Sequence, residues 1–316
     1  MTFEIPRESY PAQVRTVTIG AGEKSLSIGG ATCLPFHSFD QDPGHPPRIA
    51  MEVFDEEPAK YPPPLRDYFF DVLERPKEMA LRCIDMGAEL ISLRLLGLHP
   101  EKGKSSIEAS VELVKELLAE IDVPLIVTGV NHFDRSNQAL KKIAEETAGK
   151  NLLLNWMETE NYKTIAASAM AYGHCAVALS PVDINMAKQL NILARDLGLD
   201  AEKIVMDPMT SPLGYGLDYG YTIAERIRLA ALRGDELLAN PMIFNIGWEC
   251  ARVKETHESE DQYPEWGSRE ERSALWEIVS ASSLLMAGAD LLILYHPKAV
   301  EVMKSKRDQL SAKGGE

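Results

Sequence analysis

Eight short apolar segments recur along the chain after Arg48, and a stretch with the punctuation of a helix follows each of them. The segments are apolar throughout rather than alternating, as expected for strands that are buried on both faces of a parallel sheet. Eight strand–helix units over roughly 250 residues predict an α/β fold of the (β/α)8 TIM-barrel type. The predicted strands are IAMEV, ELISLRL, PLIVTG, LLLNWM, CAVALS, IVMDP, PMIFNIG and DLLILYHP.

Helix boundaries between these strands carry the expected residues. One predicted helix begins at Pro76 and ends at Gly87, and another begins at Ser105 with Glu108 three residues later, which matches a capping box. The helix after the sixth strand is predicted over Tyr221–Arg233. A doubly wound open sheet is the competing fold, but it usually begins with a G-x-G-x-x-G turn, and the sequence has none.

The segment before the repeats predicts a β-hairpin. Its strands are Val14–Ile19 and Leu26–Ile28, joined by a short turn that contains two glycines. Because the hairpin precedes the barrel strands, we expect it to cover the barrel bottom. The whole chain, 1–316, is then one TIM-barrel domain, with residues 1–47 as hairpin and irregular segment and residues 48–316 as the barrel.

Composition excludes several classes of partner. The net charge is −15, which disfavours binding to nucleic acid and to anionic membranes, because both require a basic surface. No apolar run reaches the roughly 20 residues of a membrane span, and the N-terminus lacks a signal-peptide pattern. Cys33, Cys83, Cys175 and Cys250 lie far apart, which disfavours a zinc or iron–sulfur site in this chain and fits reduced cysteines of a cytoplasmic protein.

In a barrel of this type, function lies on the loops that follow the strands. Asp207 ends the sixth strand, and the loop after it holds Tyr215 between Gly214 and Gly216, which allow the backbone to approach a flat ligand closely. Amide side chains both donate and accept hydrogen bonds, so they suit a ligand edged with amides, or a pterin ring. Other polar residues at or just after strand ends are Asn131, His132, Asn155, Asp183, Asn245, Tyr295 and His296.

These residues also have purely structural interpretations. Asn155 and Asn245 can satisfy backbone groups at strand ends, and Asp183 can stabilise the positive end of a helix. Trp248 and Trp266, on an acidic insertion after the seventh strand, suit either local packing or a docking patch; we favour docking, because aromatic residues are enriched at interfaces.

Motifs of several enzyme classes are missing. The sequence has no G-x-S-x-G elbow, no P-loop and no H-E-x-x-H motif. No lysine stands at a strand end, which disfavours a Schiff-base aldolase. A hydrolytic enzyme is therefore disfavoured, and no catalytic or metal-binding residue is predicted.

Several long segments carry a resemblance to a known family, and the resemblance extends over nearly the whole chain. The sequence resembles the small subunit of the corrinoid iron–sulfur protein, also called the delta subunit of CO dehydrogenase/acetyl-CoA synthase. The segments are GGATCLPFH, LLLNWMETENYK, SPVDINMAKQLNIL, DPMTSPLGYGLDYGYTIAERIRLAAL and YPEWGSREERSALWE.

The resemblance implies a TIM barrel in a heterodimer with a large subunit. That partner would hold an iron–sulfur cluster and a corrinoid-binding domain, with cobalamin between this domain and the open top of the barrel. The complex would take a methyl group from methyltetrahydrofolate, through a separate methyltransferase, and deliver it to acetyl-CoA synthase/CO dehydrogenase in the reductive acetyl-CoA (Wood–Ljungdahl) pathway. The chain lacks the D-x-H-x-x-G motif of proteins that carry their own corrinoid, which agrees with a capping role.

Position in the barrel, rather than the resemblance, assigns the cofactor-binding residues. The main alternative function is a corrinoid methyltransferase that binds methyltetrahydrofolate itself, in which Asp207 and Asn155 would bind the pterin ring. A third interpretation is a subunit without catalytic activity that only shields the cofactor. The predicted cofactor-binding residues are Asn131, Asn155, Asp183, Asp207, Gly214, Tyr215, Gly216, Asn245, Tyr295 and His296.

Overall fold

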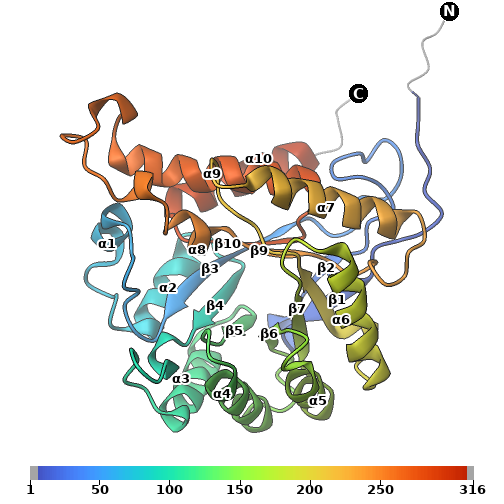
Figure 1. Cartoon of the computed structure of the whole chain (residues 1–316), viewed down its shortest axis with the longest axis horizontal. Helices are drawn as coiled ribbons and strands as arrows, with labels where there is room; N and C mark the ends of the chain where they lie inside the picture. The colour runs from blue at the N-terminus through green and yellow to red at the C-terminus, as the bar shows by residue number, and fades with distance from the viewer. Residues whose placement is uncertain (1–5, 312–316) are drawn as a thin grey trace, which may run out of the picture.

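The eight apolar segments form the eight parallel strands of a barrel in the computed structural model, which describes residues 6–311 (Figure 1). The predicted domain limits at residues 1 and 316 lie outside the described residues. The strand order is β8-β7-β6-β5-β4-β3-β10-β9, and a parallel bridge between Met206 and Met242 joins the two outer strands, so the barrel is closed. The strands are β3 (Arg48–Phe54), β4 (Leu90–Arg94), β5 (Leu125–Thr128), β6 (Leu153–Met157), β7 (Cys175–Leu179), β8 (Ile204–Asp207), β9 (Ile243–Asn245) and β10 (Leu291–Leu294).

Helices surround the barrel, and two further helices, α1 (Pro63–Phe69) and α8 (Ile246–Cys250), lie in loops after β3 and β9. The surrounding helices are α2 (Pro76–Asp85), α3 (Ile107–Glu120), α4 (Phe133–Glu146), α5 (Tyr162–Tyr172), α6 (Ile184–Asp196), α7 (Leu217–Leu232), α9 (Arg269–Ala287) and α10 (Pro297–Ser311). Short 3-10 turns are η1 (Gly22–Lys24), η2 (Leu96–Leu98), η3 (Ala201–Lys203), η4 (Lys254–Thr256) and η5 (Pro264–Trp266).

Two predicted helix starts differ from the structure. Helix α3 is capped by Ser106, whose Oγ accepts from the backbone N–H of Ala109 at 3.1 Å, so the cap lies one residue later than predicted. Helix α7 begins four residues before the predicted Tyr221 and continues through Gly220. A Cβ on Gly220 would lie 2.7 Å from Oγ1 of Thr210, so this glycine permits close packing of the preceding loop and does not end the helix.

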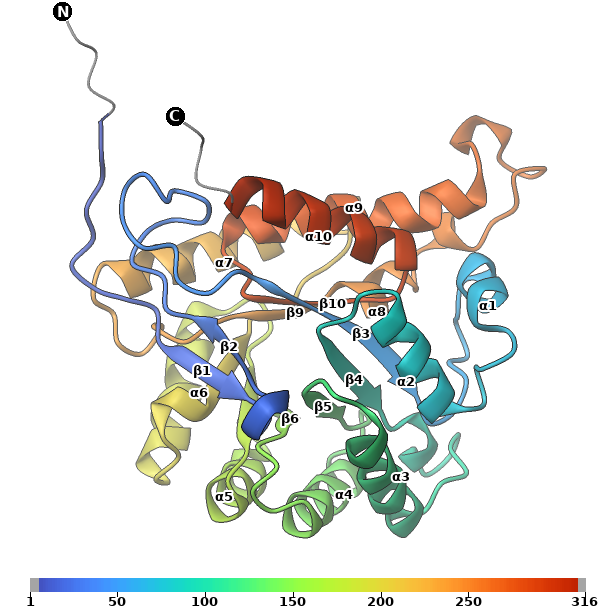
Figure 2. The same ribbon diagram turned by 180° about the vertical axis from the view of Figure 1, so that it is seen from behind.

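The predicted hairpin is present, with strands β1 (Thr16–Ile19) and β2 (Leu26–Gly29), and it covers the barrel bottom. Figure 2 shows it at the end of the barrel opposite α1. Val17, Ile19 and Ile28 are fully buried and belong to the same hydrophobic cluster as the barrel strands. The hairpin therefore closes the end of the core at which the strands begin.

Asn151, just before β6, ties the hairpin to the barrel. Its Nδ2 donates to the backbone oxygens of Thr18 at 2.7 Å and Gly20 at 3.0 Å, and its own backbone oxygen accepts from the N–H of Gly20 at 2.8 Å. Its φ is 51°, in the left-handed region, where asparagine is tolerated better than most residues.

We expect Asn151→Ala to lower the free energy of unfolding by about 3 kcal/mol, because it strains the backbone and removes all hydrogen bonds of the side chain. The two that Nδ2 donates to backbone oxygens contribute about 1 kcal/mol each, and Oδ1 also loses the weaker contacts with Nζ of Lys203 and Sγ of Cys175. Asn151→Gly loses the same hydrogen bonds without strain and should cost about 2 kcal/mol. Urea unfolding of both variants measures the difference. Equal losses would mean that the backbone conformation contributes nothing.

Candidate functional site

A buried carboxylate organises the mouth of the barrel, the end at which the strands finish. Glu52 on β3 is 1% exposed, and its Oε1 accepts from Oγ of Ser92 at 2.9 Å and from Nδ2 of Asn245 at 3.0 Å. Its Oε2 accepts from Nε of Arg94 at 2.9 Å and from the hydroxyl of Tyr295. Four donors thus compensate the buried charge. We call these five residues the Glu52 network.

An aromatic side chain covers the network. The guanidinium of Arg94 lies 4.1 Å from the ring centroid of Trp248, a cation–π contact, while its other side is paired with Glu52. Asn245 places Trp248, since its Oδ1 accepts from the backbone N–H of Trp248 at 3.1 Å and caps α8. These contacts agree with the local-packing interpretation of Trp248.

Hydrogen bonds extend the network to two more strands. Oγ of Ser92 lies 3.4 Å from Oγ1 of Thr128 on β5, and Nδ2 of Asn155 on β6 donates to the same Oγ1 at 3.0 Å. Asn155 is 5% exposed. The predicted residues Asn155, Asn245 and Tyr295 are thus brought together, but as parts of one internal polar cluster.

Asp207 stands at the end of β8, as predicted, and is half-buried. Its Oδ1 accepts from the backbone N–H of Met209 at 2.8 Å. Burial raises the pKa of Asp207 to about 7, and the negative charge of Glu249 on α8 adds to the increase. Burial also raises the pKa of Glu249. Asp207 therefore exists partly in its neutral form near pH 7 and can donate a hydrogen bond.

Two residues at the rim of the mouth have strained backbones and exposed apolar side chains. Val182 has φ 48° and is 43% exposed, and Met209 has φ 60° and is 39% exposed. Their loops are joined by hydrogen bonds from the N–H of Ser180 to the oxygen of Asp207 and from the N–H of Val182 to the oxygen of Pro208, both at 2.9 Å. Such strain is concentrated at ligand clamps. The sequence did not indicate either position, because valine and methionine are neither glycines, which mark positive φ values, nor polar residues, which mark binding sites.

The glycine loop before α7 lies at the same end of the barrel. Gly214 and Gly216 have positive φ values of 80° and 106°, which explains the choice of glycine at both positions. Tyr215 between them is 52% exposed, and its hydroxyl donates to Oε2 of Glu255 at 3.0 Å. Its ring is thus available to a ligand or partner.

The remaining predicted residues have different surroundings. Asn131 is exposed in the loop before α4. Asp183 caps α6, accepting from the N–H groups of Asn185 at 2.8 Å and Met186 at 3.1 Å, which fits the structural interpretation. His296 is fully buried against the ring of Tyr68, and burial lowers its pKa to about 4, so it is neutral.

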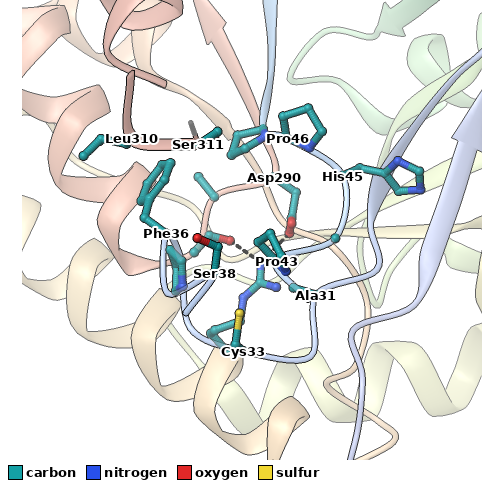
Figure 3. A pocket seen from close by; sticks show the side chains of 16 residues that line it. Ala31, Cys33, Phe36, Ser38, Pro43, His45, Pro46, Asp290, Leu310 and Ser311 are labelled. Atoms are coloured by element: carbon teal, nitrogen blue, oxygen red, sulfur yellow. Dashed lines mark hydrogen bonds and ion pairs between the residues drawn. The ribbon is translucent and has the colours of Figure 1, made fainter. Parts of the chain in front are cut away.

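A cavity of about 240 Å³ lies at the opposite end of the barrel, beneath the segment between β2 and β3 (Figure 3). Phe36, Pro43 and Pro46 line it, together with the buried pair of Arg228 and Asp290, whose Nη2 and Oδ2 are 2.7 Å apart. Because function in such barrels lies at the carboxyl ends of the strands, we place the candidate site at the mouth and not in this cavity.

Within residues 6–311, no group of three or more His, Cys, Asp or Glu side chains is arranged to hold a metal ion. The four cysteines are free and buried. None of the helices in this described range is both long enough and apolar enough to cross a membrane.

Comparison with known sequences gives a match over most of the chain. The family model of the CO dehydrogenase/acetyl-CoA synthase delta subunit matches residues 16–305. The delta subunit of the acetyl-CoA decarbonylase/synthase complex of Methanocaldococcus jannaschii is 34% identical over 324 residues, covering 100% of this chain and 78% of that protein. The delta subunit from Archaeoglobus fulgidus is 34% identical over 325 residues, covering 98% of this chain and 71% of its own length.

Solved structures with a similar fold include dihydropteroate synthases. The enzyme from Xanthomonas albilineans in complex with 7,8-dihydropteroate has a TM-score of 0.60 at 13% identity, covering 94% of this chain and 99% of its own. The enzyme from Coxiella burnetii in complex with pteroic acid has a TM-score of 0.57 at 10% identity, covering 95% and 100%. At these identities the likeness concerns the fold alone, and it agrees with the predicted TIM barrel.

We expect Glu52→Gln to lower the free energy of unfolding by about 3 kcal/mol, because it leaves the charge of Arg94 buried without a counter-charge. Adding Arg94→Met removes that charge, so the double variant should lose less than the sum of the two single losses. Urea unfolding of the three variants tests this, with Glu249→Gln as a control that costs under about 1 kcal/mol. Additive losses would contradict the coupling.

Asp207→Asn should stabilise the fold at high pH. The aspartate has a pKa of 3.8 when unperturbed and about 7 in the fold, so between these values only the folded chain retains the proton. Ionisation of Asp207 therefore costs the wild type stability as pH rises from about 4 to 7, and the variant lacks this contribution. The two should agree below pH 4 and differ by about 2 kcal/mol at pH 8, a value reduced for partial exposure.

Denaturant unfolding between pH 4 and 9 measures this difference. Asp183→Asn, in the neighbouring loop, is the matched control and should stay within about 0.5 kcal/mol of the wild type, because asparagine also caps helices. A constant offset between Asp207→Asn and the wild type at every pH would exclude the raised pKa.

Proposed function

The chain belongs to the family of the CO dehydrogenase/acetyl-CoA synthase delta subunit, the small subunit of the corrinoid iron–sulfur protein, and we propose that it caps a corrinoid during methyl transfer. The match over residues 16–305 is the observation that carries this proposal. When bound, the corrinoid supplies the cobalt that carries a methyl group from methyltetrahydrofolate, through a separate methyltransferase, to acetyl-CoA synthase. In this proposal, the chain itself positions the corrinoid and shields it from solvent.

In this proposal, the cobalamin and an iron–sulfur cluster are held by a larger partner subunit, with the corrinoid between that subunit and the barrel mouth. The absence of a D-x-H-x-x-G motif supports this arrangement, since that motif is typical of proteins that would hold a corrinoid themselves. The whole assembly is a heterodimer that works in the cytoplasm, where free cysteines such as the four in this chain persist.

The Glu52 network favours a cap over a deep binding pocket. All four hydrogen bonds of the Glu52 carboxylate are made within the chain, and Trp248 covers Arg94 from outside. A ligand that entered the barrel centre would have to displace these partners. The buried charge of Glu52 or Arg94 would then lose its counter-charge, which costs several kcal/mol. In this proposal, a ligand therefore contacts the residues at the rim of the mouth and does not enter the barrel centre.

The rim fits one face of a flat macrocycle with amide side chains. Val182 and Met209 present apolar surface, while Asn131 and the loop of Tyr215 present amide, hydroxyl and backbone groups around it. Apolar contact removes water from the face of the corrin, and polar groups at the edge accept and donate to its amides. Asp207, partly neutral near pH 7, can serve as a further donor.

One observation supports the alternative function, a methyltransferase that binds methyltetrahydrofolate. Oδ1 of Asp207 stabilises the turn by accepting from the N–H of Met209, which leaves Oδ2 for a hydrogen bond with a pterin ring. Calorimetry of the isolated chain with methyltetrahydrofolate separates the two functions. Binding in the micromolar range would favour the methyltransferase. Purification from a native extract should recover a cobalt- and iron-containing subunit at equal stoichiometry if the capping function holds.

We expect Met209→Glu and Tyr215→Ala each to lower cobalamin retention by the purified heterodimer at least tenfold, because the first buries a charge at the proposed contact and the second removes an aromatic face. Met170→Glu is the matched control, since Met170 on α5 is 49% exposed on the outside of the barrel. Cobalt content after gel filtration measures retention. Full cobalamin content in both rim variants would refute this site.

A further inference from the structure

The cavity at the barrel bottom is not used by the proposed function. Its volume is about 240 Å³, and it lies beneath the segment between β2 and β3, at the end of the strands opposite the mouth (Figure 3). Two of the segments that carry the family resemblance form part of its wall. GGATCLPFH contributes Ala31, Cys33, Pro35 and Phe36, and IAERIRLAAL contributes Arg228.

Hydrogen bonds hold the outer wall of the cavity in place. The N–H of Thr32 donates to the backbone oxygen of Asp42 at 2.8 Å, and the N–H of Asp42 donates back to Oγ1 of Thr32 at 3.1 Å. The N–H of His45 donates to the oxygen of Gly29 at 2.8 Å, which brings the end of the segment back to β2. The segment is therefore a compact loop closed on itself, and the cavity is preformed, as small-molecule sites usually are.

Rings and other apolar groups form much of the wall. Figure 3 shows Phe36, Pro43 and Pro46 around the cavity, and Phe36 has φ 62°, a strained conformation of the kind found at ligand clamps. Burial raises the pKa of the Cys33 thiol, which is therefore neutral and adds to the apolar wall. A cavity of about 150 Å³ is enough to hold benzene, so this one has room for a single substituted aromatic ring.

The ion pair of Arg228 and Asp290 forms the polar part of the wall. These residues are 4% and 6% exposed, and Nη2 of Arg228 donates to Oδ2 of Asp290 at 2.7 Å and to the backbone oxygen of Gly288 at 2.5 Å. Oδ2 of Asp290 also accepts from the N–H of Met242 at 2.8 Å. Within residues 6–311, Nη1 of Arg228 and Oδ1 of Asp290 make no hydrogen bond.

These two atoms are open to the cavity. Nε of Arg228 also lacks an acceptor, but it is enclosed by protein, whereas Nη1 and Oδ1 are not. Because both side chains are otherwise buried and line the cavity, their accessible atoms face it. The ion pair thus offers a ligand one donor and one acceptor while its charges cancel. A primary amide, with an oxygen that accepts and a nitrogen that donates, complements both.

We propose that this cavity is a second binding site, for a single aromatic ring that bears a primary amide. The ring packs against Phe36 and the proline rings, the amide oxygen accepts from Nη1 of Arg228, and the amide nitrogen donates to Oδ1 of Asp290. The inference does not depend on the capping function, because no residue of the barrel mouth takes part.

Benzamide is the probe, and saturation-transfer NMR measures its binding to the full chain. We expect saturable binding with a Kd of about 1 mM or tighter, in keeping with a ligand of this size. Benzoate and benzamidine keep the ring but should bind at least tenfold more weakly, because each brings a like charge to one member of the ion pair. Without saturable benzamide binding the site is refuted, and equal binding of all three compounds refutes the amide.

Two variants locate the binding. Ser38→Phe fills the cavity from its wall without changing the ion pair and should weaken benzamide binding at least tenfold. Ser305→Phe, exposed on α10 and outside the cavity wall, is the matched control and should leave the affinity unchanged. Unchanged affinity in Ser38→Phe, or an equal loss in Ser305→Phe, would place the benzamide elsewhere and overturn the inference.

Arg228→Lys tests the polar part of the wall. It keeps the positive charge but removes Nη1, so benzamide should bind at least fivefold more weakly. Thermal unfolding by circular dichroism verifies that each variant is folded, and Ser38→Phe decides the outcome if Arg228→Lys does not fold. Unchanged affinity in a folded Arg228→Lys would contradict the role of the ion pair.

Discussion

The carboxylate of Glu52 is the group on which the mouth of the barrel depends. Its hydrogen bonds join β3 to residues on β4 and β9 and to Tyr295, directly after β10. These four strands are neighbours in the sheet, where the first two barrel strands meet the last two. A buried carboxylate is stable only with its acceptor sites filled, and a buried guanidinium only with a counter-charge. Each partner therefore holds the others in place, and the positions of Asn245 and Trp248 follow from the same network.

A mouth built in this way has consequences for function. At its centre, the side chains of the Glu52 network satisfy one another's hydrogen bonds, so a ligand there would have to displace existing partners of a buried carboxylate. The accessible groups are those of the loops after β7 and β8, where Val182 and Met209 are held in strained conformations. The proposed contact with a corrinoid therefore rests on the apolar side chains of this rim, above the buried Glu52 network.

Much of the fold was predictable because burial on both faces makes parallel strands apolar throughout, and because glycine and proline mark helix ends. Asn155, Asp207 and Asn245 were found for a related reason, since each is a polar residue in the second half of an otherwise apolar predicted strand. In the structure Asp207 and Asn245 end β8 and β9, whereas Asn155 lies in the middle of β6. Glu52 and Arg94 were missed, although single charged residues within otherwise apolar strands are a usable signal of a paired buried charge. The strain at Val182 had no such signal.

The sequence by itself determined that this chain is a barrel of repeated strand–helix units, closed at the bottom by a hairpin, and it identified the family. Only the tertiary structure decided which polar strand-end residues act together. Asn131, Asp183 and Asn245 look alike in the sequence, yet one is exposed, one caps a helix and one binds Glu52. The reason is geometric: barrel closure determines which side chains point inward, and a shift of one residue reverses that direction.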